Sequence, residues 1–284
     1  MENILVATDF SARSDRALRR AMHIARRRNS VIYLLHVVDG DQPHRLIESD
    51  HSLAALLLAE AASTLTVEDR LSSKSIVTVG DVDSAVLETA DDIGADLIIM
   101  GPHRKRIRDV FTGTVVERVL RRAERPLLIA AEPPIAPYQK VLLALDFDEA
   151  SKSAGRAAVA LGIFENMDVV VMHAFDTPAA GMLRRSMLGD AVPDYVEEER
   201  QDAANKMHDL AGAIGLPSGR RHVVAVNGTP ARTILEAAQG NGAELVVMGA
   251  NQRKGFECLL IGSVAQDVIR NGMHDILIVP DKGI

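Results

Sequence analysis

One stretch of the chain combines residue types that could do chemistry on a phosphate. The segment ELVVMGANQRKGFECLLIGSV (residues 244–264) places an apolar run before Gly249, continues with polar residues, and sets Gly262 and Ser263 where a helix should begin. A glycine lets backbone approach a phosphate closely, and a helix start offers free N–H groups and a positive end to an anion. The stretch predicts a phosphate cradle or, in the plainer interpretation, a strand-to-helix turn that needs glycines.

A second stretch repeats this pattern earlier in the chain. In DLIIMGPHRKRIRDVFTGTV (residues 96–115), Gly101 follows an apolar run, and Gly113 and Thr114 precede an expected helix. Five collinear matches extend the repetition: 3–11 with 140–148, 33–39 with 170–176, 77–81 with 224–229, 96–101 with 244–249, and 113–130 with 262–279. The offset is 137 residues at first and 148 or 149 later, which predicts a duplicated domain with an insertion of eleven residues in the second copy.

A proline-rich segment separates the two copies. Residues 131–138 read AEPPIAPY, and none of the three prolines can lie inside a helix or a central strand. We therefore expect a short, stiff linker between one domain at residues 1–132 and another at residues 138–284.

Each copy alternates apolar runs with amphipathic stretches. The runs of the first copy are apolar on successive residues, which is typical of parallel strands covered on both faces. They lie at 4–7, 31–38, 76–79, 97–100 and 127–131. Asp81 and Thr229 stand where helix N-caps are wanted, with Pro230 at a first helical position. This order predicts an α/β protein with two tandem doubly wound domains, whose ligands bind beyond the carboxyl ends of the strands.

Composition narrows the classes of function. With 47% hydrophobic and 25% charged residues among 284, the chain is globular, and a net charge of −7 argues against nonspecific nucleic-acid binding. The sequence shows no membrane span and no secretion signal at its start. Its single cysteine, Cys258, fits a reducing cytoplasm. We find no P-loop, G-x-S-x-G or H-E-x-x-H motif that would indicate an enzyme.

Each half resembles a universal stress protein domain. The resemblance lies in a first strand ending VATDFS or LALDFD, a second strand LLHVVD or VMHAFD, and the late segments DLIIMG…GT and ELVVMG…GS, and it covers essentially all of residues 1–281. The family's ATP-binding branch has G-x2-G-x9-G-S/T after the fourth strand. Here Gln252 or Arg104 replaces the second glycine, and the final interval of the first half is eight residues instead of nine.

This resemblance implies a fold and a set of contacts. Each half would be a five-stranded parallel sheet of order 3-2-1-4-5 with helices on both faces, and the fifth strands of the two halves would pair. An aspartate after the first strand and the backbone of the second would contact the nucleoside, a glycine after the third would border the ribose, and the late glycines would hold phosphate. The residues so implied are Asp9, Val37, Gly80, Gly101, Arg104, Gly113 and Thr114, and then Asp146, Ala174, Gly228, Met248, Gly249, Gln252, Gly262, Ser263 and Val264.

The sequence thus predicts a cytoplasmic stress-response protein that binds an adenine nucleotide (ATP, or else AMP or ADP) without significant turnover. Because the second half keeps the nine-residue interval, we expect the nucleotide to prefer residues 138–284. Its partners would be this nucleotide, the other half of the chain and, as an open alternative, a second copy, with no nucleic acid, membrane span or metal. The competing class is a stress scaffold or interaction protein whose clefts are empty or hold another small ligand.

Other suggestive residues have plain interpretations. His36 and His173 occupy matching sites inside the second strands and are expected to be core or cap histidines. Cys258 reads as a small buried hydrophobe. The arginines of residues 13–28 are expected on a solvated helix face, and residues 177–195 are expected to pack locally, to cover the second site or to meet a partner.

Overall fold

The structure of the protein is a computed structural model that divides into two compact units. The first contains Met1–Pro137 together with Met273–Leu277, and the second contains the rest of the described chain. The described residues are 1–102, 113–175, 177, 192–216, 220–226, 228–250 and 262–280. Arg104, Gln252, His103 and Cys258 lie outside them, as do residues 178–191 of the insertion.

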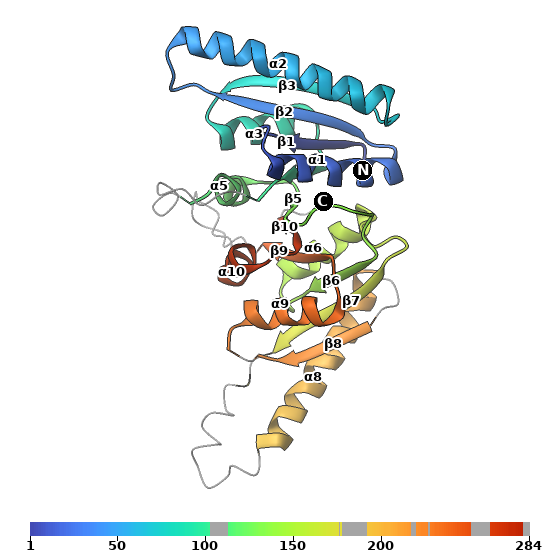
Figure 1. Ribbon diagram of the computed structural model, residues 1–284. Helices are drawn as coiled ribbons and strands as arrows, with labels where there is room; N and C mark the ends of the chain where they lie inside the picture. Colours follow the sequence, from blue (N-terminus) through green and yellow to red (C-terminus); the bar gives the residue numbers. More distant parts are fainter. Residues whose placement is uncertain are drawn as a thin grey trace. The chain divides into compact units, whose positions relative to one another are not determined.

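The first unit is a parallel sheet with helices on both faces (Figure 1). Its elements are β1 (Asn3–Ala7), α1 (Ala12–Arg28), β2 (Val31–Asp39), α2 (His44–Val67), β3 (Ser73–Gly80), α3 (Val82–Asp92), β4 (Leu97–Met100), α5 (Val115–Arg122) and β5 (Leu127–Ile129). The strand order is β3-β2-β1-β4-β5, with every described pair parallel. Because such crossovers are right-handed, α1 and α2 lie on one face, and α3 and α5 on the other.

The second unit repeats this topology. Its elements are β6 (Lys140–Ala144), α6 (Glu149–Ala160), β7 (Asp168–Phe175), α8 (Val192–Ala213), β8 (Arg220–Ala225), α9 (Pro230–Asn241), β9 (Leu245–Ala250) and α10 (Ser263–Asn271), followed by β10 (Asp275–Pro280), whose first three residues belong to the first unit. The order β8-β7-β6-β9-β10 matches that of the first unit. The predicted fold class and strand order are therefore confirmed, while the domain bounds at 132 and 138 stay a prediction.

The apolar runs form the core, as their successive hydrophobic residues predict. In β1, Ile4, Leu5 and Val6 have no exposed surface, and all four residues of β4 are buried. The expected helix caps are also present. The side chain of Asp81 accepts a hydrogen bond from the N–H of Ser84 at the start of α3, and Thr229 caps α9, in which proline takes the first position. These caps fix where helices begin at the carboxyl edge of each sheet.

One arginine of α1 contradicts the expectation of a solvated face. The side chain of Arg20 is only 5% exposed, and its Nε lies 2.9 Å from Oδ2 of Asp275, whose side chain is fully buried. Arg20 also donates to the carbonyl of Ala136 (2.9 Å), and Asp275 accepts from the N–H of Glu132 (2.9 Å). A charge leaves water at acceptable cost only when it is paired and hydrogen-bonded, which is the case here.

The same helix face holds the proline-rich segment. Arg16 donates to the carbonyl of Ala131 (2.7 Å), and His23 donates to the carbonyl of Pro134. Burial and the charges of Arg20 and Arg26 lower the pKa of His23. Arginines that were expected in solvent therefore fix the linker on α1 through its carbonyls. The stiffness predicted from the prolines has a second source in these hydrogen bonds.

Candidate functional site

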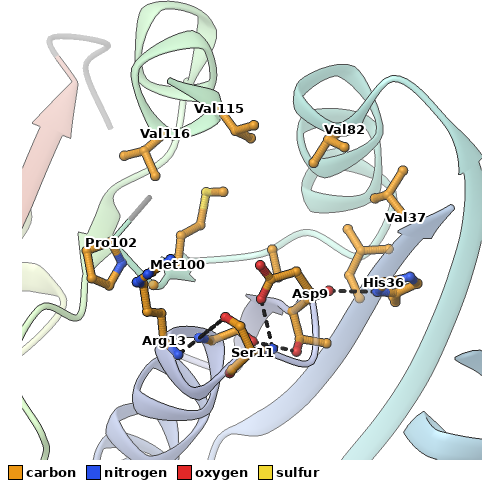
Figure 2. A pocket seen from close by; sticks show the side chains of 15 residues that line it. Asp9, Ser11, Arg13, His36, Val37, Val82, Met100, Pro102, Val115 and Val116 are labelled. Carbon is orange, nitrogen blue, oxygen red and sulfur yellow. Dashed lines mark hydrogen bonds between the residues drawn. The ribbon is translucent and has the colours of Figure 1, made fainter. Parts of the chain in front are cut away.

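A cleft of about 410 Å³ opens at the carboxyl ends of β1, β2 and β4. Figure 2 shows Asp9 and Arg13 on one side of it, His36 and Val37 on another, and the start of α5 opposite. Its volume lies within the range of small-molecule sites. Of the residues implied by the resemblance, the cleft brings together Asp9, Val37 and Gly101.

Asp9 is held as an acceptor at the edge of this cleft. The N–H of Ser11 donates to its Oδ1 at 3.0 Å. Partial burial acts to raise the pKa of Asp9, but hydrogen bonds from Ser11 and Ser14 outweigh burial and leave the pKa below its ordinary value. The ionised carboxylate can therefore accept hydrogen bonds from a hydroxyl or amino group of a ligand at neutral pH.

A histidine and a phenylalanine support the loop that carries this aspartate. Nδ1 of His36 donates to the carbonyl of Thr8 (2.8 Å), and its ring lies 4.5 Å from that of Phe10. The second unit repeats both contacts: His173 reaches the matching carbonyl at 2.9 Å, and its ring lies 4.1 Å from that of Phe147. The two histidines therefore bind the backbone beside the cleft, in agreement with the expected role as core or cap residues.

The start of α5 is closed by its own side chains. Thr114 accepts from the N–H of Glu117 (3.2 Å), and the carboxyl group of Glu117 accepts from the N–H of Thr114 (2.9 Å). Glu117 is 3% exposed, so this capping box is buried. The neighbouring cation, Arg118, is paired with Asp83 at 2.7 Å. The N–H groups of Thr114 and Glu117 and the charge of Arg118 are thus satisfied by neighbouring side chains.

The glycines of the first unit have structural reasons of their own. Gly113 has φ of +78°, and a Cβ there would lie 2.8 Å from Oε2 of Glu117. A Cβ on Gly101 would lie 2.5 Å from the carbonyl oxygen of Arg13. Gly80, with φ of +152°, ends β3. Tight turns and close backbone packing explain these positions without a ligand.

The second unit sets its implied residues along the same sheet edge. Asp146 follows β6, Ala174 lies near the end of β7, and Gly228 precedes α9 with φ of +85°. Met248 pairs with the last residue of β6, and Gly249 lies inside β9, which continues to Ala250. The expectation that this strand ends at Gly249 is therefore wrong, although these residues all lie at the carboxyl edge.

The start of α10 differs from that of α5. Gly262 is its N-cap, and no described side chain accepts a hydrogen bond from its first turn. Glu117 is replaced at an offset of 149 residues by the neutral Gln266. A Cβ on Gly262 would meet no atom of the described residues within 4 Å. With Ser263 and Val264 in the first turn, this helix start presents uncapped N–H groups.

Sequence reasoning did not single out several residues that line the first cleft. Ser11 and Arg13 come from the start of α1, Val82 from α3, and Val115 and Val116 from α5. Their signal was available, since each follows shortly after a strand that ends at this sheet edge. Among the described residues no cluster of three or more histidine, cysteine or acidic side chains could hold a metal ion. Within the same residues, no helix has the length and apolarity needed to cross a membrane.

Comparison with known proteins agrees with this geometry. The universal stress protein family model matches residues 1–131 and again 137–280. A universal stress protein of Mycolicibacterium smegmatis is 25% identical over 97% of this chain and 96% of its own length. One from Methanocaldococcus jannaschii is 28% identical over 50% of this chain and 82% of its own length.

A solved structure shares the fold over the whole chain. The crystal structure of a universal stress protein from Archaeoglobus fulgidus superposes with a TM-score of 0.72 at 19% identity, covering 99% of this chain and 98% of that chain. The two family matches fall on the two copies found as an internal repeat, and each copy has the strand order and loop positions described above. The chain therefore belongs to the universal stress protein family, as a tandem member with two such domains.

Proposed function

We propose that this stress-response protein binds an adenine nucleotide, ATP first among them, without significant turnover and preferentially in the second repeat. The observation that carries the proposal is the contrast between two helix starts. The start of α10 has no side-chain cap among the described residues, whereas Thr114 and Glu117 close the start of α5. Free N–H groups at a helix start, together with its positive end, favour a phosphate.

The aspartate loop of the second repeat supports the nucleoside end of the proposal. Asp146 accepts from the N–H of Phe147 (2.8 Å), and its own N–H donates to Oγ of Ser151 (2.9 Å). The carboxylate is therefore oriented by the loop, which is itself held by His173. Ala174, one residue further along β7, offers backbone groups at the same sheet edge. Such an arrangement suits hydrogen bonds to a base or sugar.

Binding without turnover is proposed on the sequence, in which no P-loop, G-x-S-x-G or H-E-x-x-H motif indicates an enzyme. We place the protein in the cytoplasm because its one cysteine suits a reducing compartment. Pairing of the two repeats through their fifth strands belongs to the same proposal, on the strength of the family resemblance.

A second candidate rests on the first cleft. Its capping box and the Arg118–Asp83 pair leave few groups for a phosphate, while about 410 Å³ remains between Asp9 and α5. A neutral or cationic small ligand would suit this cleft better than a nucleotide, because its polar groups include an ionised carboxylate. In this alternative the first repeat senses another small molecule and the protein acts through partners.

A reciprocal exchange of one side chain tests the proposal. Gln266→Glu gives α10 the acidic group of α5, and Glu117→Gln removes it from α5. We expect Gln266→Glu to weaken ATP binding by about tenfold or more, the equivalent of 1.4 kcal/mol, because a carboxylate would compete for the N–H groups and repel the phosphate. Glu117→Gln should leave the affinity of the tighter site unchanged. Isothermal titration calorimetry on the full chain measures both.

Three outcomes would contradict the proposal. If Gln266→Glu binds ATP as the parent does while Glu117→Gln alters binding, the assignment to the second repeat is wrong. If purified protein releases no nucleotide on heat denaturation and millimolar ATP causes no thermal shift, the scaffold alternative is favoured. If ATP hydrolysis proceeds well above that of a heat-inactivated control, the absence of turnover is wrong.

A further inference from the structure

The outer face of α2 exposes a row of apolar side chains. This helix runs along β2 and β3 of the first unit (Figure 1), and Ala54, Leu58 and Leu65 on its inner side are buried. On the outer side the exposed fractions are 51% for Leu46, 57% for Leu53, 67% for Leu56 and 74% for Val67. A single exposed leucine is ordinary, but four large apolar side chains along one face of a helix indicate an interaction surface.

The spacing of these residues is that of a helix-packing seam. Positions 46, 49, 53, 56, 60, 63 and 67 alternate in steps of three and four residues, which is the heptad spacing of two packed helices. They read Leu, Ser, Leu, Leu, Glu, Ser and Val, and all are exposed. Large side chains separated by small ones allow a second helix to approach closely.

The fold itself does not require this seam. Helix α8 connects β7 to β8 just as α2 connects β2 to β3, and its outer face is charged. There Arg200 pairs with Glu197 (3 residues apart) and Lys206 with Asp202 (2.6 Å), in solvent. Among the described residues of α8, the apolar seam therefore has no counterpart.

A hollow lies directly beside the seam. It measures about 230 Å³ and runs between α1 and α2, with Leu34 and Leu58 as its buried floor and Leu18, Leu57 and Phe10 around it. When two identical surfaces meet about a two-fold axis, the ridge of each copy can fit into the hollow of the other.

From these observations we infer that α2 is an interface through which two copies of this chain associate, with the two α2 helices antiparallel. In the register that joins the leucines, Leu53 lies opposite the partner's Leu56, and Leu56 opposite the partner's Leu53. Ser49 then lies opposite the partner's Glu60. Arg45, at the edge of the seam, lies one helical turn, about 6 Å along the axis, from the partner's Glu60 and within an arginine's reach.

Charge decides between the two directions. A parallel pair in register would place Glu60 against the partner's Glu60 in one layer, and like charges there repel. The antiparallel pair separates these two carboxylates and places each opposite the partner's Ser49, with the partner's Asp50 and Arg45 flanking that contact. The seam spans 22 residues, about 33 Å, and so buries less than a standard interface of about 1,600 Å². The dimer should therefore depend on concentration, with a dissociation constant on the order of micromolar.

Sedimentation velocity of the full chain from about 1 to 100 µM tests this interface, a range chosen to bracket that dissociation constant. We expect the sedimentation coefficient to rise with concentration for the parent and to stay at the monomer value for Leu53→Glu/Leu56→Glu. Both side chains are largely exposed, so this variant should fold, which circular dichroism checks. Ile135→Glu, at a residue that is 93% exposed elsewhere, is the matched control and should dimerise as the parent does.

A charge exchange tests the direction. Arg45→Glu and Glu60→Arg should each raise the dissociation constant several-fold, and the double exchange should restore it. A parent chain that stays monomeric throughout, or a dimer that Leu53→Glu/Leu56→Glu leaves intact, would overturn the proposal. A dimer weakened by the leucine changes but indifferent to both charge exchanges would overturn the antiparallel register. None of these results depends on nucleotide binding, which calorimetry measures separately.

Discussion

The first and second repeats keep the same backbone at the sheet edge and differ in single side chains placed on it. Both have a histidine that holds the aspartate loop and a phenylalanine against that histidine. At the helix start that follows the fourth strand, one repeat has Glu117 in a buried capping box and the other has Gln266. At this position the two repeats therefore differ between an acidic side chain that caps its helix and a neutral glutamine.

The two repeats also differ in side chains that lie away from the cleft. Arg20 enters a buried ion pair, whereas the residue 137 positions later, Ala157, is a small buried side chain. The outer face of α2 is apolar and that of α8 is charged. Duplication preserved the strand order and the loop supports, while charge and surface character changed independently in each copy. A tandem chain can thus divide ligand binding and assembly between its halves.

The largest effect should come from Arg20→Ala, which leaves Asp275 buried without its arginine. Loss of one partner of a buried pair costs about 3–5 kcal/mol in the free energy of unfolding. Denaturation by urea, followed by circular dichroism, should show this loss for the first unit. Arg19→Ala is the control, since its pair with Asp15 is exposed and should be worth no more than about 0.5 kcal/mol. Equal effects would contradict the assignment.

A smaller difference between the repeats should follow when valine replaces each of the two matching glycines. Gly113→Val forces a β-branched residue to φ of +78° and against Glu117, which should destabilise the protein by about 1–3 kcal/mol. In Gly262→Val the Cβ meets no described atom within 4 Å at ordinary φ, so the variant should change stability by less than about 0.5 kcal/mol while it reduces ATP binding. Thermal unfolding and calorimetry separate the two effects. Loss of stability at Gly262 would remove it as a test of binding.

Removal of a hydroxyl at each helix start should have a smaller effect still. Thr114→Ala deletes the side chain that caps α5 and should cost about 1 kcal/mol. Ser263→Ala, at the uncapped start of α10, should cost no more than a few tenths of a kcal/mol. Urea midpoints of the two variants, measured side by side, give the comparison. Equal costs would mean that Ser263 caps its helix after all.

The smallest expected effect concerns the free energy of unfolding at acid pH. The pKa of Asp9 is lower in the folded protein than its ordinary value, so its contribution is complete above the unfolded pKa of about 3.9 and is lost as pH falls through the folded pKa. Asp9→Asn should cost at most about 0.5 kcal/mol at pH 7, because the group is largely exposed. That cost should shrink as the pH falls through the folded pKa, below the ordinary value of the group. A cost undiminished below the folded pKa would assign it to the side-chain geometry instead.

Sequence reasoning reached the fold because the signals for it are local. Successive apolar residues, N-caps such as Asp81 and Thr229, and the internal repeat each predict an element or its order without knowledge of distant contacts. The candidate site was predicted as a sheet edge for the same reason, since aspartates and glycines follow strand ends. The pattern could not reveal that Glu117 closes one helix start, because a capping box and a phosphate site share the same glycine and hydroxyl residues.

Arg20 escaped prediction for a different reason. Six other arginines lie on α1, and only a partner 255 residues away makes Arg20 the buried one. The leucines of α2 posed the opposite problem, because an apolar helix residue is normally assigned to the core of its own domain. Long-range pairing and surface exposure both depend on the finished structure, and neither leaves a signal in the local pattern.

The ion pair of Arg20 has a consequence for how the protein is made. Residues 273–277 belong to the first compact unit, yet they follow most of the second repeat along the chain. Domains of a growing chain usually fold in turn from the N-terminus. Here the buried arginine of α1 must wait for Asp275. The first unit therefore finishes folding only after most of the second repeat has been synthesised, and a product terminated before Asp275 would retain an arginine whose native partner was never made.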